Sequence, residues 1–204
     1  MIAIVDYGSG NVQAIANIYR RLDIQTFLAT SPPDLECADR IILPGVGAFD
    51  QAMSHLNESG LRATLNKRVL EDEVPLLGIC VGMQLLARRS DEGSLPGLGW
   101  IDADVRRFDD SLFAQRTRLP HMGWNDIERR REHALLGALD EQCGFYFLHS
   151  FYVACDRPQD VLAETEYGLR FHAAVQVRNV LGVQFHPEKS HHNGVQLLKN
   201  FALM

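Results

Sequence analysis

The sequence has few cysteines, and their spacing fits neither a disulfide framework nor a zinc site. Cys37, Cys80, Cys143 and Cys155 are spread over 204 residues, and no two form a C-x-x-C pair. Disulfide-rich domains carry several cysteines within a much shorter chain, and zinc sites need closely spaced ligands. We therefore expect no metal site, and we interpret Cys37, Cys143 and Cys155 as small buried hydrophobic residues.

Long apolar runs and a leader segment are also missing. No apolar stretch approaches the ~18 residues that a membrane-spanning helix needs. The chain opens directly on the apolar segment 2–5, with no charged leader and cleavage site before it. We expect a cytoplasmic protein that does not act at a membrane. The net charge of −6 argues against nucleic acid as a partner.

Nucleotide-binding motifs are incomplete. Gly8 and Gly10 follow an apolar segment, but Gln13 stands where a dinucleotide-binding loop needs its third glycine. No phosphate-binding loop of the Walker type occurs either. We expect neither a nucleotide site nor any other cofactor.

Composition and segment pattern predict one α/β domain over residues 1–204. The chain is 46% hydrophobic and 23% charged, which is typical of a globular enzyme. Its first half alternates apolar and helical segments, the pattern of a parallel sheet. Its second half consists mainly of strand-like segments, with a turn at Arg178-Asn179 and a final helix over 194–201. We expect a mixed, mostly parallel central sheet with helices on both faces and antiparallel strands in the C-terminal half. Expected strands are 2–6, 24–29, 40–43, 74–79, 101–108, 144–155, 161–165, 171–178 and 180–185, and expected helices are 11–19 and 49–73.

Cys80 lies between Gly78 and Gly82, where an apolar segment meets a helical one. A nucleophile on a sharp strand-to-helix turn needs small neighbours, because the backbone and the helix pass close by. A helix N-terminus also favours the thiolate. By itself the G-x-C-x-G pattern leaves two readings open, a reactive thiol and a buried structural cysteine.

His186 and Glu188 supply the groups that would activate such a thiol. His186 follows the apolar segment 181–185 and precedes a proline, so it lies at a strand end, where catalytic groups collect in α/β proteins. Glu188 is close enough to fix the tautomer of the ring. Together with Cys80 they predict a Cys-His-Glu triad. We interpret His191 and His192 as surface loop residues.

Gly45, Val46 and Gly47 follow Pro44 directly after the third expected strand. This glycine-rich stretch is predicted to be a loop that no regular element absorbs. Its flexible backbone could aim an N–H group at the oxyanion that forms during acyl transfer. An ordinary loop is the alternative that the residues leave open.

Three motifs together resemble the class I glutamine amidotransferases. They are GICVGMQLL around Cys80, PGVGAF from Pro44 and QFHPEKS from Gln184. Three more segments are similar to the glutaminase subunits of imidazole glycerol phosphate synthase: DYGSGN at 6–11, LPHMGWN at 119–125 and YFLHSF at 146–151. The resemblance spans nearly the whole chain.

The resemblance implies a substrate, a mechanism and a partner. Cys80 would attack the side-chain amide of glutamine, with His186 as general acid and base and Glu188 orienting it. Ammonia would pass to a barrel-shaped cyclase subunit in a heterodimer, for histidine biosynthesis. The residues implied for the oxyanion and for glutamine are Gly45, Val46, Gly47, Val81, Gln84, Ser150 and Phe151. Those implied for the partner interface are Trp124, Tyr146 and Lys189.

Three alternatives remain open. The segment 12–19 is more similar to a paralogous branch that supplies ammonia for sugar amidation in surface-polysaccharide synthesis, and 190–193 departs from the small residues usual after HPEKS. A stand-alone cysteine hydrolase of related fold would keep the triad without the partner. A non-catalytic regulatory subunit would keep only the scaffold.

Overall fold

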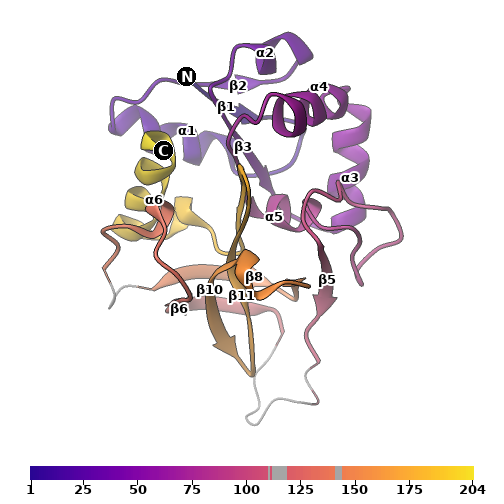
Figure 1. The fold of residues 1–204 in the computed structure, drawn as a ribbon, viewed down its shortest axis with the longest axis vertical. Coiled ribbons are helices and arrows are strands. Elements are labelled where there is room, and N and C mark those ends of the chain that lie inside the picture. Colours follow the sequence, from indigo (N-terminus) through magenta and orange to yellow (C-terminus); the bar gives the residue numbers. More distant parts are fainter. Residues whose placement is uncertain (110, 112–118, 141–143) are drawn as a thin grey trace.

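A mixed eight-stranded sheet forms the centre of the molecule (Figure 1). This computed structural model describes residues 1–204 except 110, 112–118 and 141–143. The five strands of the parallel part are, in order, β2 (Thr26–Ala29), β1 (Ile2–Val5), β3 (Arg40–Gly45), β4 (Leu76–Cys80) and β12 (Val180–Val183). The sheet continues antiparallel through β11 (Leu169–Val177), β10 (Val161–Tyr167) and β7 (Glu128–Arg129). The expected fold class is thereby confirmed.

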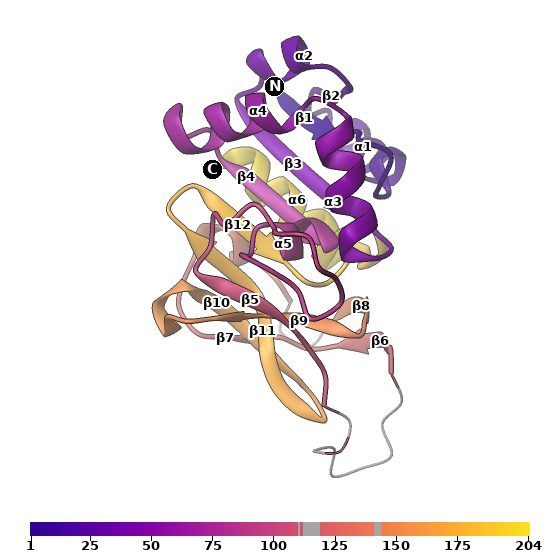
Figure 2. The same ribbon diagram turned by 90° about the vertical axis from the view of Figure 1, so that its right-hand side faces the viewer.

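Helices cover both faces of the parallel strands. Figures 1 and 2 show α1 (Val12–Arg21) and α6 (His191–Leu203) on one face, and α3 (Phe49–Glu58) and α5 (Val81–Leu85) on the other. The remaining helical segments are α2 (Pro32–Glu36), α4 (Arg62–Asn66) with its π-helical continuation Lys67–Glu71, and the 3-10 turns Ala134–Leu136, Pro158–Asp160 and Pro187–Lys189. None of the helices in the described part of the chain could span a membrane.

The central strands form the core because they are covered on both sides. Every residue of β1, β4 and β12 is buried. Strands that face helices on both sides are continuously apolar, which is how these segments appear in the sequence. The predicted turn at Arg178-Asn179 is confirmed, since Val177 pairs with Val180 across it and Arg178 has a φ of +51°.

The segment 144–155, expected as one strand, forms two. β8 (Phe145–His149) pairs with β6 (His121–Asn125), while β9 (Phe151–Cys155) pairs with β5 (Ala103–Arg107). The apolar pattern runs through both strands, so it could not reveal that the chain changes sheet at Ser150. The break matters for function because it places Ser150 in the lining of the same cavity as Cys80.

The loop expected from Pro44 begins later than predicted. Pro44 and Gly45 continue β3 and pair with Ile79 and Cys80 of β4. A proline fits here because the pairing of β3 with β1 ends at Ile42, and the Pro44 carbonyl instead accepts a hydrogen bond from the Tyr7 hydroxyl at 2.8 Å. The loop proper therefore starts at Val46.

The three cysteines outside the predicted triad were expected to be buried hydrophobic residues. Cys37 is exposed, so its interpretation as a buried residue is wrong. Cys155 is half-buried, and burial raises the pKa of its thiol to about 12, as expected of an inert cysteine. Cys143 lies outside the described residues.

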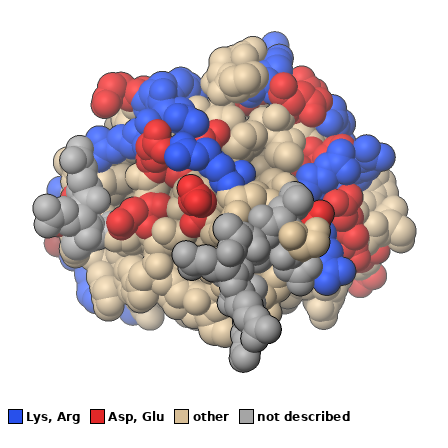
Figure 3. Space-filling view, turned by 90° about the horizontal axis from the view of Figure 1, so that it is seen from below, with Lys and Arg blue, Asp and Glu red and all other residues tan. Residues whose placement is uncertain are grey.

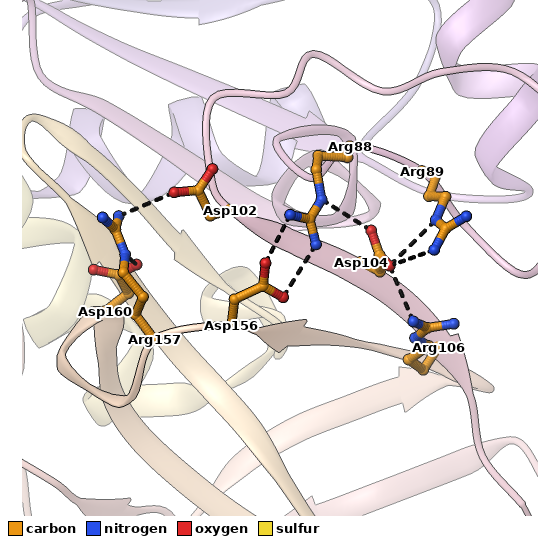
Figure 4. A network of polar contacts seen from close by, with 8 residues as sticks. All are labelled: Arg88, Arg89, Asp102, Asp104, Arg106, Asp156, Arg157 and Asp160. Carbon is orange, nitrogen blue, oxygen red and sulfur yellow. Dashed lines mark hydrogen bonds and ion pairs between the residues drawn. The ribbon is translucent and has the colours of Figure 1, made fainter.

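A network of ion pairs holds the segment after α5 against β5 (Figure 4). The buried carboxylate of Asp104 accepts hydrogen bonds from Arg88 at 3.1 Å, Arg89 at 3.0 Å and Arg106 at 3.0 Å. Arg88 also binds Asp156 through two bonds of 2.7 and 3.1 Å. On the face in Figure 3 basic and acidic side chains likewise lie next to each other. The arginines of this network therefore hold the segment after α5 against β5.

Candidate active site

Cys80 occupies a strained turn between β4 and α5. Its φ is +54° and its ψ is −114°, a conformation that non-glycine residues rarely adopt and that costs about 1–3 kcal/mol. The flanking glycines permit the turn. A Cβ at Gly82 would lie 1.9 Å from the Leu43 carbonyl oxygen, and one at Gly78 would lie 2.8 Å from the Gly82 carbonyl oxygen. The two glycines of the G-x-C-x-G pattern are therefore required by backbone approach.

His186 and Glu188 form a buried pair near this turn. His186 follows β12, and Glu188 lies in the 3-10 turn after it. Nδ1 of His186 is 2.9 Å from Oε1 of Glu188, and their side chains are only 4% and 2% exposed. A carboxylate can only accept, so the proton of this bond lies on Nδ1. The other ring nitrogen is thereby left for proton transfer.

The surroundings of His186 favour its charged form. Burial acts to lower the pKa of the ring, but hydrogen bonds and charge interactions with Cys80 and Glu188 outweigh burial and raise the pKa to about 10. The Cys80 sulfur and the Glu188 carboxylate on either side of the ring thus favour its protonated form. It holds a proton ready for donation to a leaving group.

A cavity of about 440 Å³ opens over these groups. Most of the predicted site residues line it: Val46, Gly47, Cys80, Val81, Gln84, Ser150, Phe151, His186 and Lys189. Gly45 lies behind the cavity, where a Cβ would be 2.5 Å from the Gly82 nitrogen. Glu188 supports His186 from behind. The tertiary structure thus brings together residues from separate parts of the sequence.

Val46 is held in a conformation that engages its amide. Its N–H donates to Oγ of Ser9 at 3.0 Å, and its carbonyl accepts from the same hydroxyl at 2.9 Å. The amide therefore cannot bind an oxyanion until the loop moves away from Ser9. The motif DYGSGN contains Ser9, but nothing in the sequence indicated this contact.

Gln184 was not predicted as a site residue. Its amide nitrogen lies 3.8 Å from the Cys80 sulfur, and its amide oxygen accepts from Gln84 at 3.2 Å. Gln184 precedes His186 by two residues, and alternate residues of a strand share a face, so this signal was available in the sequence. The Gln84 amide also donates to the Phe151 carbonyl at 3.1 Å.

An aromatic cluster lies beside the cavity at the predicted partner surface. Trp124 is 51% exposed and packs edge-on against Tyr146, with ring centroids 6.2 Å apart. The Lys189 ammonium lies 5.5 Å from the centre of the Tyr146 ring. His191 stacks on Trp124 at 4.9 Å and begins α6 together with His192. Both histidines are exposed, as expected, but they are helical and not in a loop.

Within the described residues, no group of three or more histidine, cysteine, aspartate or glutamate side chains is arranged to hold a metal ion. The chemistry that the cavity offers is nucleophilic attack by a thiol, proton transfer by a histidine and orientation of that histidine by a carboxylate.

Many solved structures share this fold, and two of them illustrate the match. One, described as the crystal structure of a glutamine amidotransferase, matches with a TM-score of 0.72 at 23% identity and covers 100% of both chains. Another, described as the structure of PurLQS from Thermotoga maritima, matches with a TM-score of 0.71 at 16% identity and covers 99% of this chain and 96% of its own. At this identity the likeness concerns the fold alone.

Comparisons of sequence identify the family as well as the fold. The sequence model described as "Glutamine amidotransferase class-I" matches residues 3–204. A Bdellovibrio bacteriovorus protein named imidazole glycerol phosphate synthase subunit HisH is 55% identical over 202 residues, covering 99% of both chains. A Leptospira interrogans protein of that name is 46% identical over 99% of both chains. A Pseudomonas aeruginosa protein named subunit HisH 2 of that synthase is 46% identical, covering 99% of this chain and 98% of the relative. With matches of this extent, the chain belongs to the class I glutamine amidotransferase family.

Proposed function

We propose that this chain is the glutaminase subunit of an imidazole glycerol phosphate synthase. It hydrolyses glutamine to glutamate and supplies the ammonia to a cyclase subunit. That subunit makes imidazole glycerol phosphate and aminoimidazole carboxamide ribotide in histidine biosynthesis. The observation that carries the proposal is the cavity lined by Cys80 and His186, with Glu188 paired to the His186 ring. The chain is also 55% identical to a relative with this name.

The proposed reaction begins with attack of the Cys80 sulfur on the side-chain amide carbon of glutamine. His186 donates its proton to the departing nitrogen, so ammonia leaves and a glutamyl thioester remains. His186 then removes a proton from water, which attacks the thioester carbon. Collapse of this second adduct releases glutamate and frees the Cys80 sulfur, and His186, which has regained a proton from water, is again protonated as at the start.

The oxyanion of each adduct needs two N–H donors. We assign these to Val81, which follows the nucleophile, and to Val46 after its release from Ser9. The bond between Val46 and Ser9 keeps the second donor engaged, so turnover is expected to be slow until the loop moves. A partner that favours the moved loop would raise the rate by shifting this equilibrium.

The partner in this proposal is a barrel-shaped cyclase that forms a heterodimer with the chain. Trp124, Tyr146 and Lys189 are assigned to the interface. Support comes from the exposed Trp124 and its neighbour Met122, which is 61% exposed on the same strand. Large exposed apolar side chains beside a cavity are typical of a protein interface.

The test is to co-express the chain with the cyclase subunit encoded in the same genome and measure glutamate release with and without that subunit. We expect partner-dependent turnover and none in Cys80→Ala. Binding to an acceptor enzyme of sugar amidation instead would assign the chain to the polysaccharide branch suggested by residues 12–19. Rapid turnover without any partner, or full activity in Cys80→Ala, would contradict the proposal.

A further inference from the structure

Two buried histidines lie at the wall of the cavity, outside the triad. His149 is the last residue of β8, and His121, the first residue of β6, is its cross-strand partner. They are 7% and 2% exposed, and His149 lines the cavity beside Cys80. Both belong to motifs that carry the resemblance, but neither was predicted as a site residue, and the proposed reaction does not use them.

The two rings form a chain of hydrogen bonds that ends on the backbone of the site. Nδ1 of His149 is 2.7 Å from the carbonyl oxygen of Phe151, and its Nε2 is 3.2 Å from Nδ1 of His121. Because a carbonyl only accepts, Nδ1 of His149 carries the proton. Both rings are neutral at physiological pH, since burial lowers the pKa of His149 to about 3 and that of His121 to about 4. Nε2 of His149 therefore accepts, and Nδ1 of His121 donates.

The carbonyl at the end of this chain belongs to the segment that closes the cavity. The Phe151 oxygen accepts a second bond from the Gln84 amide, which also binds Gln184 beside the Cys80 sulfur. A carbonyl oxygen has two acceptor positions, and both are occupied by buried donors. The backbone at Phe151 is thus held from two sides, one of them supplied by the histidines.

The neighbours of the pair leave the rings little freedom. His121 stacks between Phe147 at 4.8 Å and Tyr167 at 4.0 Å. His149 packs against Phe108 at 5.4 Å and Phe171 at 5.1 Å. In an aromatic cluster of this kind a phenylalanine could fill either position, so packing alone does not require histidine. What phenylalanine could not supply is the hydrogen bond to Phe151.

We propose that His121 and His149 act as a positioning pair that fixes the Phe151 backbone, and with it the wall of the cavity that holds glutamine. This inference rests on the proposed glutaminase function. His149 makes the bond to the wall, and His121 fixes the tautomer and orientation of His149. Neither takes part in the chemical step.

The main test is steady-state kinetics of His149→Phe, His121→Phe and the double variant in the co-expressed complex. We expect His149→Phe to raise KM for glutamine about tenfold, with a much smaller change in kcat, because one buried bond to the wall is lost. Since both residues act through one chain of bonds, the double variant should be no worse than His149→Phe alone. The rate at which iodoacetamide alkylates Cys80 should stay within about twofold of the unsubstituted protein, because the nucleophile itself is unchanged.

Two variants act as controls. His149→Asn keeps an N–H group near the position of Nδ1, so it should reverse part of the KM increase expected in His149→Phe. His172→Phe removes another partly buried histidine with a backbone bond, to Cys155 at 3.1 Å, but outside the cavity lining. Its KM should not change. An unchanged KM in His149→Phe, or additive losses in the double variant, would overturn the inference.

A measurement that needs no activity separates this inference from the proposed function. The ¹⁵N NMR shifts of both rings should show neutral histidines with the proton on Nδ1, the less common tautomer of free histidine. A proton on Nε2 in either ring would refute the pair even if glutaminase activity is found. Failure of the unsubstituted complex to release glutamate would refute the proposed function instead.

Discussion

The hydroxyl of Ser9 binds Val46 twice, accepting from its N–H at 3.0 Å and donating to its carbonyl at 2.9 Å. Ser9 lies in the turn after β1, and Val46 begins the loop after β3, so the contact ties two loops together at the edge of the cavity. The peptide group that would stabilise an oxyanion is held by a side chain 37 residues away.

Substitution of Ser9 by alanine should release this loop. Without the two bonds the Val46 amide can turn toward the cavity, so we expect partner-independent glutamate release to rise about five- to tenfold. The assay is glutamate release by the isolated chain. Ser59→Ala, which removes a hydroxyl bond at the end of α3, is the matched control and should have no effect. An unchanged basal rate in Ser9→Ala would show that the contact does not limit turnover.

Glu188→Gln should reduce kcat at least about a hundredfold while KM for glutamine changes little. A neutral amide can accept at Nδ1 of His186, but it no longer stabilises the imidazolium or enforces the tautomer. The measurement is steady-state turnover in the complex with the partner. Glu92→Gln alters another carboxylate of the cavity lining, one that accepts from the Phe49 amide, and should leave kcat nearly intact. Equal losses in the two variants would argue against an orienting role.

The ion pair between His186 and Glu188 also predicts a pH dependence of stability. Against the effect of burial, Cys80 and Glu188 together raise the pKa of His186 to about 10, so the stabilisation is fully present below about pH 6.5 and is lost as pH rises through 10. The difference in Tm between the unsubstituted chain and Glu188→Gln should therefore be largest near pH 6 and shrink by pH 10. Thermal unfolding at several pH values measures it. A constant difference would contradict the contribution of Glu188 to the raised pKa.

Asp104→Asn should lower the free energy of unfolding by about 2 kcal/mol, because three arginines lose a shared, buried carboxylate. The Arg89 and Arg88 hydrogen bonds hold the pKa of Asp104 below its usual range, so this stabilisation disappears only in acid. Urea unfolding at pH 7 checks the change. Asp102→Asn affects an exposed carboxylate with one ion pair of 3.5 Å and should cost less than about 0.5 kcal/mol.

Trp124→Ala should weaken the binding of the cyclase by about thirtyfold, because large aromatic side chains near the centre of an interface dominate its affinity. Isothermal titration with the purified cyclase gives the Kd. Leu70→Ala provides a matched control, since Leu70 is similarly exposed at 52% but lies in the segment after α4. Equal Kd values for Trp124→Ala and the unsubstituted chain would place the interface elsewhere.

Sequence alone determined the fold class and predicted the three groups that we propose for catalysis. The apolar central strands are visible because burial on both faces demands continuous hydrophobicity. The glycines around Cys80 are visible because backbone approach excludes any side chain. His186 and Glu188 are two positions apart, so local geometry already places them together.

Tertiary structure alone decided how the cavity wall is built and held. The change of sheet at Ser150 arises because β8, before it, pairs with β6, and β9, after it, pairs with β5. A continuous apolar pattern contains no sign of this change. The contacts of Ser9 with Val46 and of His149 with His121 join residues 37 and 28 positions apart. Such contacts depend on side-chain direction after packing, which no periodicity in a single sequence encodes. The proposed nucleophile could therefore be found by its neighbours in the chain, whereas the contacts made by Ser9 and His149 appear only once the strands are assembled.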